Sequence, residues 1–274
     1  MNTIFAKLHS DRGFSLLEVL IALTLTGVIT AAIMQAYVTQ HKNYMVQDDI
    51  TAVQQSARAA IDEVGRHVRM AGNNLPAGVP ALTPVNSNPD SLLITYRVDD
   101  CEAELDTSMA SVNDDIRCAD PVDCFEAGEM AYIFHPDSGG GEWFWITDVD
   151  SANNRLSHAL APLSQAYADG AVVMTMEQIL FYVDTLTDPD HPRMMIQLPQ
   201  QVPQIYADNV SDLQFRYRLE NGSVVDSPAL IEDVREVLIS VTGRSENPDP
   251  DDEDDDPYRR RTYSSSVNLR NIGL

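Results

Sequence analysis

The sequence predicts an α+β protein in which a long N-terminal helix packs against a mainly antiparallel β head. Three observations lead to this fold class. An uninterrupted apolar run occupies residues 14–38, and an apolar stripe at helical period follows it to about residue 71. The remaining ~200 residues contain segments that alternate between apolar and polar side chains, as half-buried strands do. No helical pattern of useful length interrupts the head.

Residues 14–38 are the predicted transmembrane or assembly helix, and they contain a single charged side chain, Glu18. A helix of this length measures about 37 Å, which is enough to cross a hydrocarbon core of ~30 Å. Lys7 and Arg12 precede the run, so the positive-inside rule keeps the N-terminus in the cytoplasm and exports the head. A carboxylate inside such a run costs at least ~2.5–3.5 kcal/mol unless it has a partner.

The second half of the helix, residues 39–73, is predicted to be amphipathic and to pack on the head. Its apolar positions recur every three or four residues, and charged side chains lie between them. Gly72-Asn73-Asn74 followed by Pro76 predicts the end of the helix near residue 71. The apolar stripe consists of Val46, Ile50, Val53, Ala57, Ile61, Val64 and Val68.

The head is expected to occupy residues 74–274. Asn221-Gly222 predicts a type I′ hairpin, and the segment DSGGGE predicts a second, looser one. Residues 246–257 form an acidic, proline-containing loop between two strands. The arginines at 259–261 either fold back on this loop, face an acidic partner or lie on a solvated strand edge, and the edge is preferred. The expected strands are Leu92–Val98, Glu129–His135, Glu142–Asp148, Val172–Asp184, Asp212–Leu219, Val234–Gly243 and Arg260–Asn268.

The charge balance and the motifs exclude several classes of function. With 42 acidic and 18 basic residues the formal charge is −24, and such a surface repels phosphate. Direct nucleic-acid binding is therefore not expected. The sequence contains no HExxH, GxSxG or GxxxxGK[ST] motif. We therefore predict no enzymatic activity and no cofactor.

Three cysteines, Cys101, Cys118 and Cys124, lie in one central stretch. An odd count leaves at least one thiol unpaired within the chain. A disulfide is expected because the head is predicted to be exported. Cys118–Cys124 is the shortest closure, and Cys101 is the alternative partner for either of the other two.

The same stretch contains carboxylates that are candidates for binding Ca²⁺, which prefers oxygen ligands. These are Asp114, Asp115, Asp120 and Asp123. Their spacing does not follow the EF-hand pattern, so a solvated loop is the preferred interpretation. The sequence predicts no metal site.

The segment RGFSLLEVLIALTLTGVI, residues 12–29, resembles the class III signal of type IV pilins and type II secretion pseudopilins. The resemblance implies a type IV pilin-like fold. It also implies that residues 1–13 are a leader peptide, which a separate prepilin peptidase removes after Gly13 before Phe14 is methylated. Glu18 is then the assembly carboxylate, which pairs with the Phe14 amine of a neighbouring subunit. Such pairing makes two charges tolerable that are each costly in lipid.

Three further segments resemble the PilW family of minor pilins: QDDITAVQQSARAAIDEVGRHVRMAGNN, ADNVSDLQFRYRLENG and SSSVNLRN. This resemblance implies a single-pass protein of the bacterial inner membrane with a periplasmic head, which then joins the pilus tip. Its implied role is to help initiate pilus assembly and to support motility and adhesion. The implied partners are other minor pilins, the major pilin and a PilY-type tip adhesin.

Two alternatives remain open at this point. The related pseudopilin J of type II secretion shares the signal and general shape, so a J-like minor pseudopilin is the first alternative. The second is a signal-anchored periplasmic enzyme or binding protein. This second alternative predicts an uncut N-terminus and a Glu18 that can be replaced without loss of activity.

Overall fold

The helix α1, Leu16–Met70, is the longest element of the chain. The computed structural model describes residues 14–137, 140–158, 162–199, 201–249 and 256–272. It divides into two units, Met1–Ile50 and Thr51–Leu274, so α1 contributes to both. The helix ends one residue before the predicted stop, and Gly72 then adopts a positive φ of 80°. The Gly72 N–H donates to the carbonyl oxygen of Thr95 at 3.0 Å, which ties the helix end to a strand.

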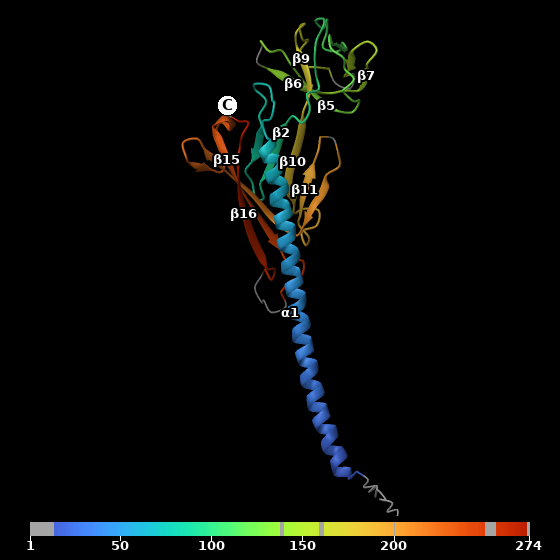
Figure 1. Cartoon of the computed structure of the whole chain (residues 1–274), viewed down its shortest axis with the longest axis vertical. Coiled ribbons are helices and arrows are strands. Elements are labelled where there is room, and N and C mark those ends of the chain that lie inside the picture. Colours follow the sequence, from blue (N-terminus) through green and yellow to red (C-terminus); the bar gives the residue numbers. More distant parts are fainter. Residues whose placement is uncertain (1–13, 138–139, 159–161, 200, 250–255, 273–274) are drawn as a thin grey trace, which may run out of the picture. The chain divides into compact units, whose positions relative to one another are not determined.

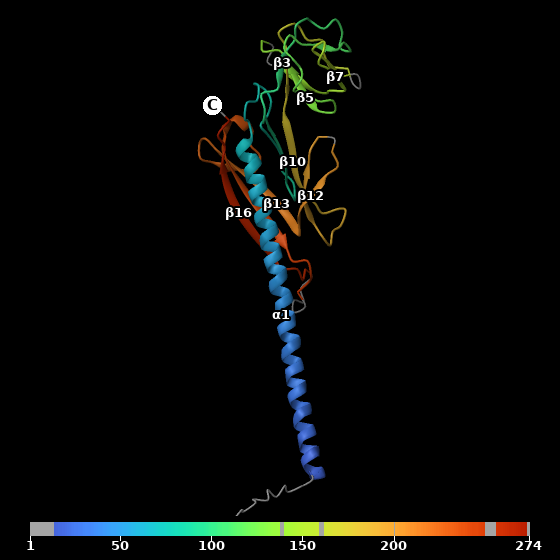
Figure 2. The ribbon, with the colours of Figure 1, turned by 45° about the vertical axis from the view of Figure 1, so that its right-hand side comes forward.

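In the second unit, the apolar stripe of α1 is buried, as predicted. Val53, Ala57, Ile61, Val64 and Val68 all lie in the interior. This face packs on two antiparallel sheets, and residues from the helix and from both sheets form one continuous core. Figure 1 and Figure 2 show the helix lying over strands of both sheets. The predicted fold class, a helix packed on antiparallel β-sheets, is confirmed.

Two sheets form the body of the head, and all of their strand pairs are antiparallel. The five-stranded sheet has the order β1-β2-β10-β11-β12, and a four-stranded sheet has the order β14-β13-β15-β16. The strands of the first are β1 Leu82–Val85, β2 Ser91–Tyr96, β10 Glu177–Asp184, β11 Arg193–Gln197 and β12 Gln204–Asp208. Those of the second are β13 Val210–Leu219, β14 Val224–Val225, β15 Val234–Arg244 and β16 Arg260–Asn268.

The helix approaches β15 closely at Gly243. A Cβ atom at this position would lie 2.5 Å from Cγ1 of Val53, closer than real Cβ contacts allow. The absence of a side chain at Gly243 therefore sets the distance between the helix and the sheet at this point.

An 80-residue lobe is inserted between two neighbouring strands of the five-stranded sheet. Strands β2 and β10 pair directly, with Tyr96 opposite Glu177. Everything between them, residues 97–176, therefore leaves the sheet and returns to it at the same place. We call this segment the inserted lobe.

The inserted lobe has two small sheets and a hydrophobic core of its own. That core includes the fully buried side chains of Ile116, Ile133 and Leu156. A second, smaller cluster packs Met174 and Met176 against the segment that follows α1. The lobe strands are β3 Glu102–Glu104, β4 Ile116–Arg117, β5 Met130–Phe134, β6 Gly141–Trp145, β7 Asp148–Asp150, β8 Arg155–Ser157 and β9 Val172–Thr175. Their orders are β3-β9-β5-β6 and β4-β8-β7.

One predicted strand and one predicted turn type of the head are wrong. The expected strand Val172–Asp184 is broken at Met176 into β9, in the lobe, and β10, in the five-stranded sheet. The hairpin at Asn221-Gly222 is present, but only Gly222 has a positive φ there, whereas a type I′ turn requires two such residues. Instead, the Leu219 carbonyl accepts the Gly222 N–H, and the Leu219 N–H donates to the Ser223 carbonyl. These two bonds enclose a three-residue loop in which Gly222 adopts the left-handed conformation.

The acidic loop falls partly outside the described residues, which exclude 250–255. On either side of that gap, Arg259 pairs with Asp249 and Arg260 pairs with Asp256. Strand β16 is also the edge strand of its sheet. The preferred interpretation, a solvated strand edge, is therefore correct for the position of β16. It is incomplete for the three arginines, because Arg259 and Arg260 pair with acids of the loop.

Candidate functional site

The predicted processing and assembly residues lie at the start of α1. Gly13, the residue before the predicted cut, lies outside the described residues. Phe14 is 86% exposed. Glu18 is in the first turn of the helix, and its Oε2 accepts a hydrogen bond from the backbone N–H of Ser15 at 3.0 Å.

Ser15 and Glu18 form a helix-capping arrangement. The Ser15 hydroxyl accepts the Leu17 N–H at 3.3 Å, and the Ser15 carbonyl accepts the Val19 N–H at 3.2 Å. A serine followed three residues later by a glutamate is the sequence signature of a capping box, in which the acid reaches back to the cap residue. Sequence reasoning missed this local role, although the Ser-x-x-Glu spacing was visible. Within a single chain, Glu18 therefore satisfies one of the free N–H groups of the helix start.

The first half of α1 presents its apolar side chains to the surroundings. Its most apolar 18-residue window has a mean hydropathy of 2.2, and none of it is buried within the protein. Among the described residues, α1 is the one helix long and apolar enough to cross a membrane. The composition and position of this segment suggest membrane anchoring.

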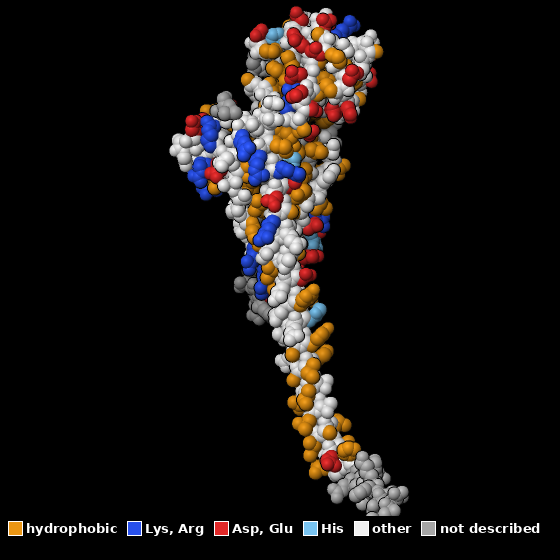
Figure 3. All heavy atoms as spheres, in the orientation of Figure 1, with side chains coloured by type: hydrophobic (Ala, Val, Ile, Leu, Met, Phe, Trp, Pro, Cys, Tyr) orange, Lys and Arg blue, Asp and Glu red, His pale blue; other side chains and the backbone are white. Residues whose placement is uncertain are grey.

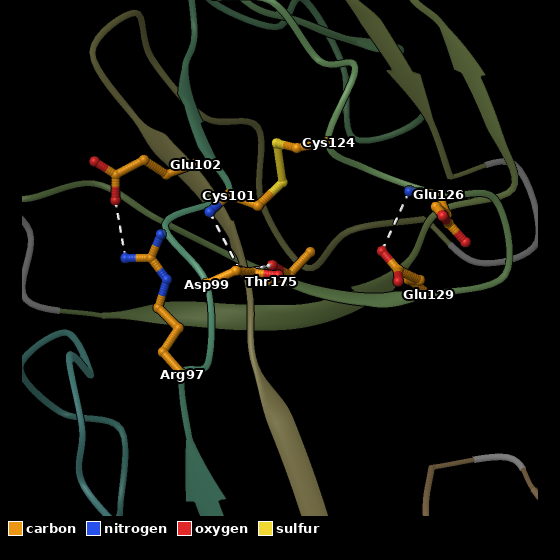
Figure 4. The surroundings of a disulfide bond; sticks show 8 residues. All are labelled: Arg97, Asp99, Cys101, Glu102, Cys124, Glu126, Glu129 and Thr175. Carbon is orange, nitrogen blue, oxygen red and sulfur yellow. Dashed lines mark hydrogen bonds and ion pairs between the residues drawn. A yellow bond between two sulfur atoms is a disulfide. The ribbon is translucent and has the colours of Figure 1, made fainter.

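The disulfide joins Cys101 to Cys124, with Cα atoms 5.7 Å apart. The preferred pairing, Cys118–Cys124, is therefore wrong, and Cys101, the alternative partner, takes its place. Figure 4 shows the bond beside Asp99, whose Oδ1 accepts the Cys101 N–H at 3.2 Å and the Thr175 hydroxyl at 3.0 Å. The bond thus ties the start of the lobe to its interior, next to β9.

Cys118 is buried as a free thiol in the lobe core. It forms a β-bridge with Leu105, and its N–H donates to the Asn154 carbonyl at 2.8 Å. These backbone bonds hold Cys118 in the lobe core. Cys124 therefore pairs with Cys101, although Cys118 is nearer to it in the sequence. Burial, followed by the charge of Asp120, raises the pKa of the Cys118 thiol to about 12. A thiol so protonated is a poor nucleophile.

The four calcium candidates do not converge on one point. Asp114 accepts hydrogen bonds from the Ser111 N–H and hydroxyl at 2.9 and 3.1 Å. Asp115 pairs with Arg155 at 3.4 Å. Asp120 accepts the N–H of Glu104 at 3.3 Å, and Asp123 is exposed. In the part of the chain that the structure describes, no group of three or more His, Cys, Asp or Glu side chains is arranged to hold a metal ion.

Acidic side chains are concentrated in the inserted lobe. Its 80 residues contain sixteen acids and three arginines, a formal charge of −13 out of the −24 of the whole chain. Figure 3 shows red side chains gathered over the lobe and arginines over the α1 face of the second unit. The lobe therefore carries more than half of the net negative charge of the chain and attracts cations.

Comparison with known proteins gives one family match. The model of the prokaryotic N-terminal methylation motif matches residues 8–34, a range that includes Phe14, Ser15 and Glu18. No curated protein matches the chain significantly. The motif marks a structural, non-enzymatic class of proteins. Together with the apolar helix and the antiparallel head, the match supports a type IV pilin-like protein or pseudopilin.

Proposed function

We propose that this chain is a minor pilin that helps to initiate type IV pilus assembly and resides at or near the pilus tip. The observation that carries the proposal is the carboxylate of Glu18, retained in the first turn of an apolar helix within the methylation motif. In this scheme a prepilin peptidase cuts after Gly13 and methylates Phe14. The helix then stands in the inner membrane with the head in the periplasm.

Assembly would give Glu18 a second partner. A carboxylate has two oxygens, and the Ser15 N–H occupies only Oε2. Glu18 can therefore keep its capping bond through Oε2 while Oε1 accepts a hydrogen bond from the Phe14 ammonium group of an adjacent subunit. Pairing is favoured in lipid, where an isolated ion of either sign is costly.

The size and construction of the head support a low-copy position rather than a repeating one. The inserted lobe adds 80 residues to one hairpin of the head, and every copy in a filament would have to accommodate it. The expected partners are other minor pilins, the major pilin and a PilY-type tip adhesin. In this proposal the complex of these proteins, and not the head alone, initiates the pilus and supports motility and adhesion.

The test compares Glu18→Gln with Glu18→Ala in the full chain. Glutamine also completes a capping box, so it preserves the local hydrogen bond and removes only the charge. We expect both variants to accumulate in the membrane and both to fail in pilus assembly, measured by pilus counts and by cross-linking to the other pilins. If Glu18→Gln assembles normally, the carboxylate serves only as a cap and the proposed pairing is wrong.

Two further measurements separate the alternatives. Mass spectrometry of the mature protein should show N-methylated Phe14 at its start, whereas an intact Met1 would favour a signal-anchored enzyme or binding protein. Deletion of the gene should remove pili and leave type II secretion intact. The opposite pattern would assign the chain to a J-like minor pseudopilin.

A further inference from the structure

A cavity of about 180 Å³ opens between the inserted lobe and the five-stranded sheet. We call it the waist pocket. Its lining comes from the segments that follow β2 and β11, from the start of β10, and from the lobe strands β5, β6 and β9. Pockets that enclose a whole small-molecule ligand measure ~300–1,000 Å³, so this one is suited to a single side chain.

Three carboxylates line the waist pocket: Asp99, Glu129 and Glu177. None of the described residues that line it is a lysine or an arginine. Arg97, the nearest arginine in the sequence, pairs with Glu102 at 2.9 Å instead (Figure 4). The negative charge of the pocket is therefore not neutralised by the residues around it.

Two of these carboxylates disfavour the charged form of the third, Glu177. Partial desolvation, followed by the charges of Glu129 and Asp99, raises the pKa of Glu177 above its ordinary value. Glu129 also accepts the Glu126 N–H at 3.2 Å, and Asp99 is held by Cys101 and Thr175, so neither can turn away freely. A cation that entered the pocket would relieve this repulsion.

The rest of the lining is mixed: Thr175, Gln178 and Gln201 are polar, and beside them lies a group of apolar and aromatic side chains. Trp145, Met130, Met176 and Leu198 line the same cavity, and Val98 beside them is 71% exposed. Such walls suit the methylene stem of a long basic side chain, and the face of an indole attracts its charged end. The cavity therefore combines the two features, an apolar wall and fixed negative charge, that a lysine or arginine side chain uses together.

The spacing of the carboxylates argues against a metal ion as the occupant. Ca²⁺ requires six to eight oxygen ligands that converge at about 2.3–2.6 Å. Asp99, Glu129 and Glu177 do not form such a group. A guanidinium or ammonium group, by contrast, can bind carboxylates that lie on different sides of it.

We propose that the waist pocket binds a lysine or arginine side chain presented by a partner protein. The charge of the inserted lobe draws the basic segment in, and the pocket then holds one side chain between Trp145 and the carboxylates. The proposal concerns the head alone and holds whether the chain serves a pilus or a secretion system.

The test uses the full chain in a zwitterionic detergent, with Trp143→Phe so that Trp145 is the single tryptophan reporter. The probe is the peptide acetyl-Ala-Ala-Arg-Ala-Ala-amide, and its citrulline counterpart is the neutral control. We expect a saturable change in Trp145 emission with the arginine peptide, and binding weaker by at least about tenfold with citrulline.

Matched variants distinguish the pocket from the general charge of the lobe. Glu129→Gln/Glu177→Gln removes two charges from the pocket, and Asp137→Asn/Asp148→Asn removes two from exposed lobe positions outside it. The first should weaken binding about tenfold, and the second should leave it within about twofold. Equal losses in the two variants, no saturable change, or a response to Ca²⁺ without one to the peptide would each overturn the proposal.

Discussion

The disulfide is predicted to stabilise the inserted lobe selectively. Cys101 and Cys124 are separated by 23 positions, so the bond closes a loop of that size in the unfolded chain. The loss of entropy on closing such a loop corresponds to about 3 kcal/mol at 25 °C. Replacing both cysteines in Cys101→Ala/Cys124→Ala should lower the local stability of the lobe by roughly this amount.

Hydrogen exchange followed by mass spectrometry of the full chain measures this effect by region. Because the lobe core is separate from the core beneath α1, faster exchange should appear in β5, β8 and β9 and not in β13 or β15. A change of about 3 kcal/mol corresponds to exchange faster by on the order of 100-fold. Dithiothreitol should reproduce the effect in the unmodified chain and add nothing in the double variant.

Cys118→Ala is the control, because it removes the buried free thiol and leaves the disulfide in place. Its effect on exchange should be limited to the small loss of packing in the lobe core. Equal acceleration in the lobe and in the body of the head would show that the two unfold as one unit. That result, or unchanged exchange in the lobe, would refute the reasoning.

Two other predictions concern the body of the head. Gly243→Val should destabilise the protein by about 1–3 kcal/mol in chemical denaturation, because its side chain meets Val53 on α1, and adding Val53→Ala should recover part of the loss. Burial lowers the pKa of His67 although Glu63 hydrogen-bonds it at 3.1 Å. In the unfolded chain the His67 imidazole has a pKa of about 6.5, so on acidification it takes up its proton at a higher pH than in the folded chain. Tm should therefore fall as the pH drops from about 7.5 to 5.5. His67→Gln should reduce that fall and His191→Gln, at an exposed site, should not; equal falls in all three chains would contradict the assignment.

Much of the helix could be predicted from the sequence because its signals are local. The apolar stripe repeats at helical period, and Gly72 supplies the positive φ with which the helix ends. The capping role of Glu18 is equally local, because Ser15 and Glu18 have the Ser-x-x-Glu spacing of a capping box, but the sequence prediction assigned Glu18 only to a partner subunit.

The head was harder to predict because its organisation depends on contacts between distant segments. The run Val172–Asp184 reads as one strand, yet it crosses from the lobe to the five-stranded sheet at Met176, and only the pairing partners reveal the change. The short strands β3, β4 and β8, of two or three residues each, carry too few alternations to be recognised. The disulfide likewise follows the lobe fold, which brings Cys101 to Cys124 while Cys118 stays bridged to Leu105.

The inserted lobe adds a proposed binding site to the head without altering the sheets that pack on α1. Neighbouring strands of a sheet lie ~4.8 Å apart, so a segment that leaves β2 and returns by β10 begins and ends at one point. Such an insertion disturbs the sheet little, provided that it has a core and a constraint of its own, and the lobe has both. The helix contacts that hold the body together lie in the other core. We therefore expect substitutions around Trp145 to change recognition of a partner while assembly through Glu18 continues, and substitutions at Glu18 to abolish assembly while the lobe remains folded.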